Sequence, residues 1–252
     1  SVMPVGVIVN CLAVLFGGLI GASLGERVPL KLRKTLPLIF GVASLGMGTG
    51  PIVRMNSLPA VVLALILGSA LGELIGLENL IEKAASKAKG PIEGLFAGRK
   101  RSGSGGEGST ASAADQREFM EQFVGIVVLF CASGTGVFGA LSEGMTGDYT
   151  VLMAKAILDF FTAGIFATTL GYLVAAVAVP QFVVLTLLFL SATVIIPLTT
   201  PTMLADFTAL GGMIMLATGF RISGIKAFPI ANMLPGFVLV MPLSYLWTTF
   251  LG

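Results

Sequence analysis

The chain has 252 residues, of which 55% are hydrophobic and 11% are charged, and its formal net charge is +2. About a quarter of the residues are charged in an ordinary soluble domain, and a soluble core of this size cannot bury so much apolar surface. The composition therefore excludes water-soluble enzyme folds and favours an all-α, polytopic membrane protein. The absence of histidine excludes histidine-based catalysis and metal ligation, and the small net charge does not indicate nucleic-acid binding.

Charged residues divide the chain into uncharged stretches, several of which reach the length of about 20 residues that spans a bilayer. We expect about eight transmembrane helices, in the ranges 1–25, 35–53, 55–72, 122–142, 149–173, 182–197, 201–219 and 227–252. The uncharged stretch 160–205 is too long for the rest of one helix, so we expect a turn at Pro180-Gln181. The first apolar run lacks a small-residue cleavage signature and is expected to be a retained span.

Basic residues test this topology independently, because they favour cytoplasmic loops. If the N-terminus lies outside, the basic residues of 27–34, 83–117 and 221–226 all lie inside. Arg54 is the main exception, since it falls in an outside loop. The charge pattern therefore predicts that both termini lie outside.

A low-complexity segment divides the chain into two membrane parts. Residues 98–116 read GRKRSGSGGEGSTASAADQ and have too few large apolar side chains to offset the entropy cost of ordering. We expect a three-helix part at 1–84, a flexible cytoplasmic linker at 85–118 and a five-helix part at 119–252. Residues 78–89 are expected to continue the third helix as an amphipathic tail.

A glycine-rich apolar segment that ends in Thr-Gly occurs three times, at Thr49, Thr135 and Thr218. We interpret each as a helix end, the first two facing outside and the third facing inside. Helices one to three and six to eight would then form an inverted repeat, which is typical of transporters with a site near the membrane midplane. Glycine is also an ordinary helix C-cap, so a chance recurrence is the alternative.

Glycines also recur at every fourth position on two of the expected helices. Such stripes let helix backbones approach closely in lipid. They predict tight packing within the chain or, alternatively, the seam of a homodimer. The residues concerned are Gly17, Gly21 and Gly25 on the first helix and Gly68, Gly72 and Gly76 on the third.

Lys155 and Asp159 are charged residues inside the fifth expected helix, and their spacing of four places them on one helix face. A charge near the bilayer centre costs at least about 2.5 kcal/mol, so it usually has a partner or a function. If Asp148 caps this helix, Asp159 lies about 16 Å deep, near the midplane. The pair either neutralises itself in a structural role or lines a polar cavity for a solute or ion.

Asn10 and Asn232 are uncharged but still costly in lipid, which predicts hydrogen bonds between helices. Asn232 lies between Pro229 and Pro235, which should interrupt the eighth helix and free carbonyl oxygens of the kind that bind cations. Asp206 is either a further site residue or a plain interfacial one. The candidate substrate- or ion-binding residues are therefore Asn10, Thr49, Thr135, Lys155, Asp159, Asp206, Thr218 and Asn232. No cofactor or metal is expected, and Cys11 and Cys131 are interpreted as small buried residues.

Four stretches resemble the bacterial YqgA/YdfK family of uncharacterised inner-membrane proteins. They are VIVNCLAVLFGGLIGASLGERVP, SLPAVVLALILGSALGELIGLE, VFGALSEGMTGDYTVLMAKAILDF and FTALGGMIMLATGFRISGIKAFPIANMLPGF. One departure is Asp206, where the family pattern leads us to expect Glu. The resemblance implies a multi-pass protein of the bacterial plasma membrane, loosely described as a transporter, with no assigned activity.

We therefore expect a membrane transporter or channel for a small solute or ion, which works by alternating access around a midplane polar site and is not an enzyme. The lipid bilayer and an unidentified solute or ion are its expected partners. The alternative is a non-catalytic, homodimeric membrane scaffold. An intramembrane aspartyl protease using two of Asp148, Asp159 and Asp206 is a third hypothesis. The sequence GMTGD lacks the compact Gly-x-Gly-Asp arrangement expected of such an enzyme.

Overall fold

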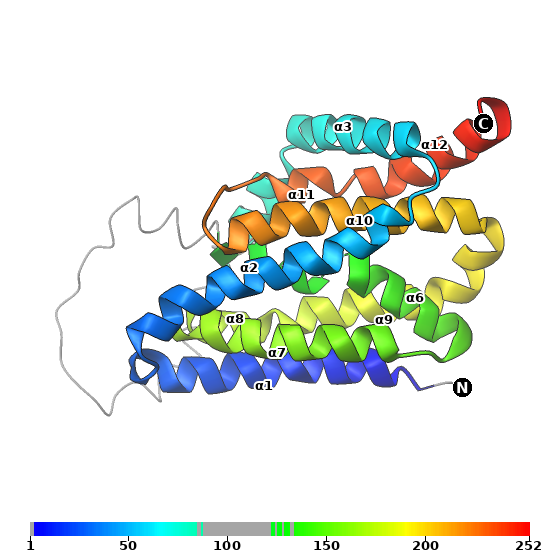
Figure 1. Cartoon of the computed structure of the whole chain (residues 1–252). Helices are drawn as coiled ribbons and strands as arrows, with labels where there is room; N and C mark the ends of the chain where they lie inside the picture. The colour runs from blue at the N-terminus through cyan, green and yellow to red at the C-terminus, as the bar shows by residue number, and fades with distance from the viewer. Residues whose placement is uncertain (1–2, 85–86, 88–121, 124, 128, 132–133) are drawn as a thin grey trace.

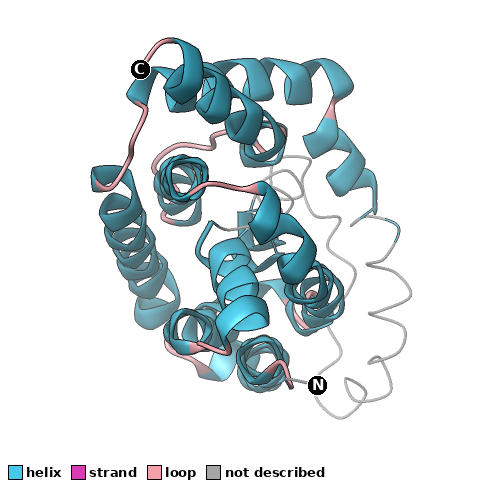
Figure 2. Cartoon of the chain, turned by 90° about the vertical axis from the view of Figure 1, so that its right-hand side faces the viewer, coloured by secondary structure: helices cyan, strands magenta, loops and turns pink. Residues whose placement is uncertain are grey.

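The computed structural model describes residues 3–84, 87, 122–123, 125–127, 129–131 and 134–252, and within these residues every regular element is a helix (Figure 1, Figure 2). Seven of the described helices are long and apolar enough to cross a membrane. A further pair of helical segments, bent by 44° relative to each other near Val137, makes an eighth span if the two segments are taken together. The chain is therefore an all-α polytopic membrane protein, in agreement with the expected span count. The predicted linker lies outside the described residues, except for Lys87.

The long helices follow the expected order, with short helical elements between some of them. The long helices are α1 (Val5–Leu24), α2 (Leu30–Val53), α3 (Leu58–Ile75), α6 (Gly134–Thr146), α7 (Thr150–Leu170), α9 (Ala178–Ile195), α10 (Pro201–Ile222) and α12 (Gly236–Phe250). The short elements are η1 (Gly25–Arg27), α8 (Leu173–Ala176), η3 (Ile196–Leu198) and α11 (Ile230–Met233).

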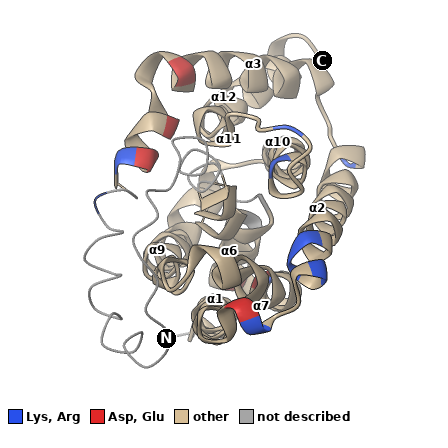
Figure 3. Cartoon of the chain, turned by 90° about the vertical axis from the view of Figure 1, so that its left-hand side faces the viewer, with Lys and Arg blue, Asp and Glu red and all other residues tan. Residues whose placement is uncertain are grey.

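Both termini lie at one end of the helix bundle, which we call the terminal end (Figure 1). The start of α2, with Lys31, Arg33 and Lys34, and the end of α10, with Arg221, lie toward the opposite end, which we call the basic end (Figure 3). The separation of these basic residues from the termini agrees with the loop assignment from the charge pattern.

Local sequence signals account for several helix boundaries. The Thr200 hydroxyl accepts a hydrogen bond of 3.2 Å from the Met203 N–H, and Pro201 follows at the first helical position of α10. Gly76 ends α3 with a left-handed φ of 71°, which glycine adopts at little steric cost. The chain is again helical over residues 77–84, so the expected helical extension of the third span is present as far as the described residues allow.

The expected turn at Pro180-Gln181 is wrong, because both residues lie in the first turn of α9. Proline is tolerated there, since the first N–H groups of a helix have no partner within the helix. The chain instead turns at Gly171, whose φ of 75° ends α7, and passes through α8 before α9 begins.

The interpretation of the three Thr-Gly pairs as helix ends is also wrong. Each pair lies within a helix: Thr49 in α2, Thr135 in α6 and Thr218 in α10. The Thr49 and Thr218 hydroxyls donate to carbonyl oxygens of their own helices, each at 2.8 Å, which satisfies them without ending the helix. The two glycines in α2 and α10 are therefore helix-surface residues rather than caps.

The glycine stripes pack helices together within the chain. A Cβ atom at Gly21 would lie 1.9 Å from the Gly164 oxygen of α7, and one at Gly72 would lie 1.9 Å from the Asn232 oxygen of α11. These contacts confirm tight intramolecular packing as the role of both glycines, and they occupy the surfaces that a homodimer seam along the same stripes would need. Cys11 and Cys131 are free and buried, as expected.

The expected interruption of the last span is confirmed. Pro229 precedes the short helix α11, and the chain breaks again at Leu234 and Pro235 before α12 begins. Proline cannot donate a main-chain hydrogen bond, which explains why one continuous helix does not form here. The Asn232 carbonyl lies against Gly72 of α3, so it contributes to packing rather than to the polar site described below.

Candidate functional site

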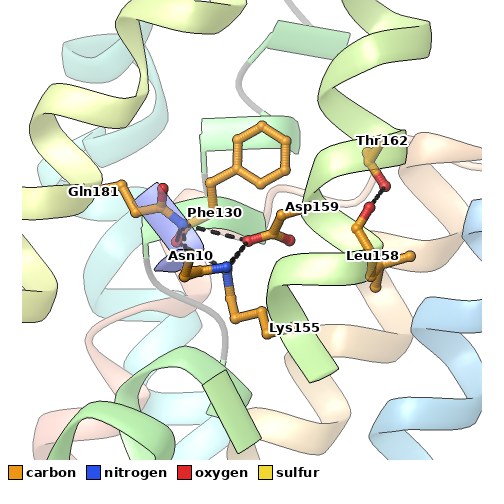
Figure 4. Close-up of polar contacts among 7 residues, drawn as sticks. All are labelled: Asn10, Phe130, Lys155, Leu158, Asp159, Thr162 and Gln181. Atoms are coloured by element: carbon orange, nitrogen blue, oxygen red, sulfur yellow. Dashed lines mark hydrogen bonds and ion pairs between the residues drawn. The ribbon is translucent and has the colours of Figure 1, made fainter. Parts of the chain in front are cut away.

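A buried polar site forms where α1, α7, α9 and the segment around Phe130 meet (Figure 4). Lys155 and Asp159 form an ion pair within α7, and their side chains are 1% and 0% exposed. The Lys155 ammonium also lies 3.2 Å from the Phe130 carbonyl oxygen and 3.4 Å from Asn10 Oδ1. Asp159 lies near the middle of α7, and Lys155 lies about one turn closer to the start of the helix.

Two amide side chains complete the site. Asn10 Nδ2 donates to Asp159 Oδ2 at 2.8 Å. Gln181 Nε2 lies within hydrogen-bonding distance of Asn10 Oδ1 at 2.7 Å, of the Phe130 oxygen at 3.0 Å and of Asp159 Oδ2 at 3.3 Å. One carboxylate oxygen, Asp159 Oδ2, therefore accepts from an ammonium group and two amides, so this half of the ion pair is strongly stabilised.

Two buried oxygen atoms of the site have no hydrogen-bond partner within the part of the chain that the structure describes. They are Asp159 Oδ1 and Gln181 Oε1. A buried polar atom without a partner costs about 1–3 kcal/mol, so such atoms are uncommon and usually point to a bound water, an ion or a function. Both atoms are acceptors, so the site has unused capacity to bind a cation or a hydrogen-bond donor.

The local sequence explains how α1 and α7 come close enough to build this site. Gly17 and Gly21 of α1 lie against the main-chain oxygens of Phe160 and Gly164 in α7, where any larger side chain would clash. Thr162, one turn beyond Asp159, donates to its own helix at Leu158 and takes no part in the network. The site is thus confined to a few side chains.

Sequence reasoning identified Asn10, Lys155 and Asp159 but missed Gln181 and the Phe130 carbonyl. Gln181 was placed in a turn beside Pro180. A signal was present, because Gln181 is the one Asn or Gln in the uncharged stretch 160–205, where a buried amide would need partners. The carbonyl of an apolar residue such as Phe130 leaves no comparable signal in the sequence.

A cavity of about 520 Å³ opens at the terminal end of the bundle, between α2, α6, α7 and α10. Val151, which lines the cavity, is one helical turn before Lys155 on α7. Thr135 is the predicted site residue that lines this cavity. Arg54, which is the exception to the charge pattern, lines it as well. We call this space the terminal-end cavity; it is lined by Met47, Pro51, Arg54, Thr135, Val151, Pro201, Leu204, Ala205 and Thr208.

Apolar side chains fill the interior on the other side of the polar site, toward the basic end. We call this group the basic-end apolar cluster, and it includes Val14, Phe130, Ala163, Phe166, Ala167 and Met215. Val14 follows Asn10 on α1, and Ala163 follows Asp159 on α7, so the cluster begins directly beyond the polar site. A second apolar cluster, which includes Val7, Leu152 and Leu185, lies on the terminal side of the polar site, so apolar side chains pack on both sides of it.

Asp206 is fully buried, but it belongs to a second polar cluster, separate from the Lys155–Asp159 site. Its Oδ1 accepts hydrogen bonds of 2.8 Å from the N–H groups of Asn56 and Ser57, and its Oδ2 accepts one of 2.5 Å from the Ser244 hydroxyl. Asp206 is therefore not a plain interfacial residue, because its side chain is fully buried. The first N–H groups of a helix have no partner within it, so Asp206 acts as a cap for the start of α3 supplied by α10.

Asn232 lies in a third polar cluster, toward the basic end. Its Nδ2 donates to Glu73 at 2.6 Å, and its Oδ1 accepts from the Glu78 N–H at 2.9 Å. Glu78 forms an ion pair with Arg221 of α10. Burial raises the pKa of the Glu78 carboxyl, although the Arg221 charge opposes this. Asn232 thus joins helices, as predicted, but it does not contribute to the Lys155–Asp159 site.

The three aspartates of the protease hypothesis have separate partners. Asp148 is exposed and accepts a hydrogen bond of 3.0 Å from the Thr150 N–H, which lowers the pKa of its carboxyl. Asp159 is bound by Lys155, and Asp206 by the start of α3. A proton-sharing pair needs two carboxyls in direct contact, so this arrangement does not support that hypothesis.

Comparisons with known proteins place the chain in a family. The model of the family described as "Protein of unknown function (DUF554)" matches residues 5–245. The chain is 46% identical to the "Uncharacterized protein YqgA" of Escherichia coli (strain K12) over 246 residues, which cover 98% of each chain. It is 27% identical to the "Uncharacterized membrane protein YdfK" of Bacillus subtilis (strain 168) over 240 residues, 93% of each.

No solved structure matches the chain. The family model covers nearly the whole chain, and the two relatives match 98% and 93% of it. The expected resemblance to YqgA and YdfK is thereby confirmed, and the chain belongs to the DUF554 family of proteins.

Proposed function

We propose that this protein is a membrane transporter that moves a small solute or ion by alternating access around the Lys155–Asp159 site. The observation that carries the proposal is the position of this site. It is buried near the middle of α7, with apolar clusters toward both ends of the bundle, and the terminal-end cavity begins one helical turn away at Val151. This is the arrangement expected of a carrier in an occluded state, with its site closed from both sides.

Helix packing supports the inverted repeat, an arrangement on which many alternating-access carriers are built. The pairs α1 and α9, α2 and α10, and α3 and α12 are each in contact, and each pairs one of the first three spans with one of the last three. Gly41 lies against the Gly219 oxygen, and Gly48 against the Gly212 oxygen, in a reciprocal arrangement. A two-fold axis that relates Gly41 to Gly212 and Gly48 to Gly219 would reproduce this pattern.

The polar site fits the same relation. The number of residues between Asn10 and Gln181 equals that between Gly41 and Gly212. The two amides, which are hydrogen-bonded to each other, would therefore occupy equivalent positions on α1 and α9. A site on the axis between two repeats is where a rocking-type carrier binds its substrate.

The basic end is assigned to the cytoplasm of a bacterial inner membrane and the terminal end to the periplasm, because basic loops favour the cytoplasmic side. In this orientation the terminal-end cavity faces outward. Arg54 would then lie at the mouth of this outward-facing cavity instead of in an ordinary loop.

A homodimeric scaffold is the alternative, and one observation favours it. Gly46 and Gly50 on α2 are exposed, and a Cβ atom at either would have no neighbour within 4 Å. A second copy could pack on this small-residue face. A scaffold gives no reason to place both charges of an ion pair, together with an unpaired oxygen, inside one span, so we prefer the carrier, which includes no catalytic step.

Cysteine labelling tests the carrier in full-length protein with Cys11 and Cys131 replaced by alanine. We introduce Thr135→Cys in the terminal-end cavity or Ala167→Cys in the basic-end apolar cluster, and treat cells and inside-out vesicles with a membrane-impermeant maleimide. Labelling of Thr135→Cys from outside and slower labelling of Ala167→Cys from inside are expected. Ala60→Cys, buried in α3, is the control. If Ala167→Cys is as unreactive as Ala60→Cys on both sides, alternating access is wrong.

A further inference from the structure

We infer that the Lys155–Asp159 site binds a small monovalent cation in place of the Lys155 ammonium group, so that each cation bound releases one proton. This inference names the substrate class of the proposed transporter. It rests on the proposed function for the transport step, whereas the binding step can be tested on its own.

The Lys155 ammonium already occupies a position surrounded by oxygen atoms. It contacts the Asp159 carboxylate, the Phe130 carbonyl oxygen at 3.2 Å and Asn10 Oδ1 at 3.4 Å. Carboxylate, carbonyl and amide oxygens are the ligands that hard cations use in proteins. The ammonium therefore marks a place where a dehydrated cation of the same charge would find ligands.

The two unpaired atoms lie on side chains of the same site. Asp159 Oδ1 and Gln181 Oε1 are buried acceptors without a partner among the described residues, and in Figure 4 they point away from Lys155, so a cation would reach them only if these side chains turned. The nitrogen atoms of Asn10, Lys155 and Gln181 already donate to oxygens of the site. The unused binding capacity is therefore for positive charge and not for an anion.

Charge balance selects a monovalent ion. The protonated Lys155 and ionised Asp159 together carry no net charge, and a net charge buried in the membrane is costly. With Lys155 protonated and Asp159 ionised, an added anion would leave the site negative, and a divalent cation with neutral Lys155 would leave it positive. Within the described residues, no three His, Cys, Asp or Glu side chains gather to hold a multivalent metal. A monovalent cation with neutral Lys155 keeps the net charge at zero.

The exchange conserves atoms and charge. The Lys155 ammonium gives one proton to water, and the cation leaves its hydration shell to bind the oxygens. No electron is transferred and no covalent bond other than the N–H bond breaks. In the part of the chain that the structure describes, three other titratable groups interact with Lys155. They are Asp159 on the same helix and the thiols of Cys11 on α1 and of Cys131. The side chain that α9 supplies, Gln181, does not titrate.

Isothermal titration calorimetry on the purified, full-length protein tests the binding step. LiCl, NaCl and KCl are titrated in two buffers with different ionisation enthalpies, with choline chloride as the salt control. At least one of the three cations should bind with a heat that depends on the buffer and corresponds to about one proton released per cation. Its Kd should fall about tenfold per pH unit while Lys155 is protonated in the free site.

Variants locate the exchange. Asp159→Asn removes the carboxylate and should abolish binding, and Lys155→Arg should abolish proton release because arginine does not lose its proton. Thr162→Val is the matched control, since Thr162 is fully buried on the same helix but outside the network, and it should bind as the wild type does. Far-UV circular dichroism checks that each variant folds, and the pH dependence of the wild type tests proton release without any variant.

Three results would overturn the inference: no binding of any of the three cations, binding without a buffer-dependent heat, or equal loss in Thr162→Val and Asp159→Asn. If maleimide labels the protein from both sides but no cation binds, the transporter proposal holds and the cation inference is wrong. If a cation binds with proton release but Ala167→Cys is not labelled from inside, the cation inference holds and alternating access is wrong.

Discussion

Asp159 and Asp206 are both fully buried, but the two carboxylates are bound in opposite ways. Asp206 accepts hydrogen bonds through both oxygens from main-chain N–H groups and a serine hydroxyl. Asp159 is paired with a lysine on one oxygen, and its other oxygen has no partner among the described residues. Burial of a carboxylate in this protein is therefore no sign of function by itself, and an unpaired buried oxygen also occurs at Glu78. The Asp159 pair differs in that both of its charges lie inside one membrane-spanning helix.

Glu143, which lies one residue beyond the expected fourth span at 122–142, extends the comparison. It is 1% exposed, and its two oxygens accept hydrogen bonds from the N–H groups of Gly6 and Val7 at 2.7 and 3.1 Å. A carboxylate from another helix thus caps the start of α1, as Asp206 caps the start of α3. Such caps stabilise helix ends because the positive end of the helix dipole and the free N–H groups favour an anion.

The largest effect is expected from Lys155→Met. The substitution leaves the Asp159 charge buried without its cation, which should lower the free energy of unfolding by about 3–5 kcal/mol. The double variant Lys155→Met/Asp159→Leu should recover much of this loss, because it removes both charges. Unfolding followed by circular dichroism in a titration with sodium dodecyl sulfate measures both. A Lys155→Met protein as stable as the wild type would mean that Asp159 is uncharged, and the contrast with Asp206 would lose its basis.

Asp206→Asn should have a smaller effect and only on stability. The amide keeps one acceptor oxygen but loses the charge that the start of α3 favours, so we expect a loss of about 1–3 kcal/mol in the free energy of unfolding. The same unfolding titration measures this loss. Cation binding measured by calorimetry should be unchanged. Loss of binding in a folded Asp206→Asn protein would place Asp206 in the functional site and remove the distinction drawn above.

Asp148→Asn should have the smallest effect. The Thr150 N–H lowers the pKa of the exposed Asp148 carboxyl, so the ionised form is favoured in the folded protein. Its contribution to stability is therefore present above the ordinary aspartate pKa and is lost as the pH falls through the lowered value. The difference in Tm between wild type and Asp148→Asn should be small at pH 6 and shrink below about pH 4. A difference that grows in acid would contradict this assignment.

Features that depend on neighbours in the chain could be predicted from the sequence. Hydrophobic length predicted the spans, and the spacing of four predicted that Lys155 and Asp159 share a helix face. The two prolines around Asn232 predicted the break before α12. The helix ends at Thr49 and Thr218 were mispredicted, because a glycine on a helix surface and a glycine at a helix end have the same local sequence.

The amino-acid sequence by itself determined that this is a multi-helix membrane protein of the DUF554 family with a lysine and an aspartate inside one span. Only the tertiary structure decided that Asn10, Gln181 and the Phe130 carbonyl surround this pair, while Asp206 and Asn232 join other helices. The physical reason is that apolar length and charge act along one helix, whereas a hydrogen bond between α1 and α7 depends on how closely their backbones pack. That packing is set by glycine contacts such as Gly21 on Gly164.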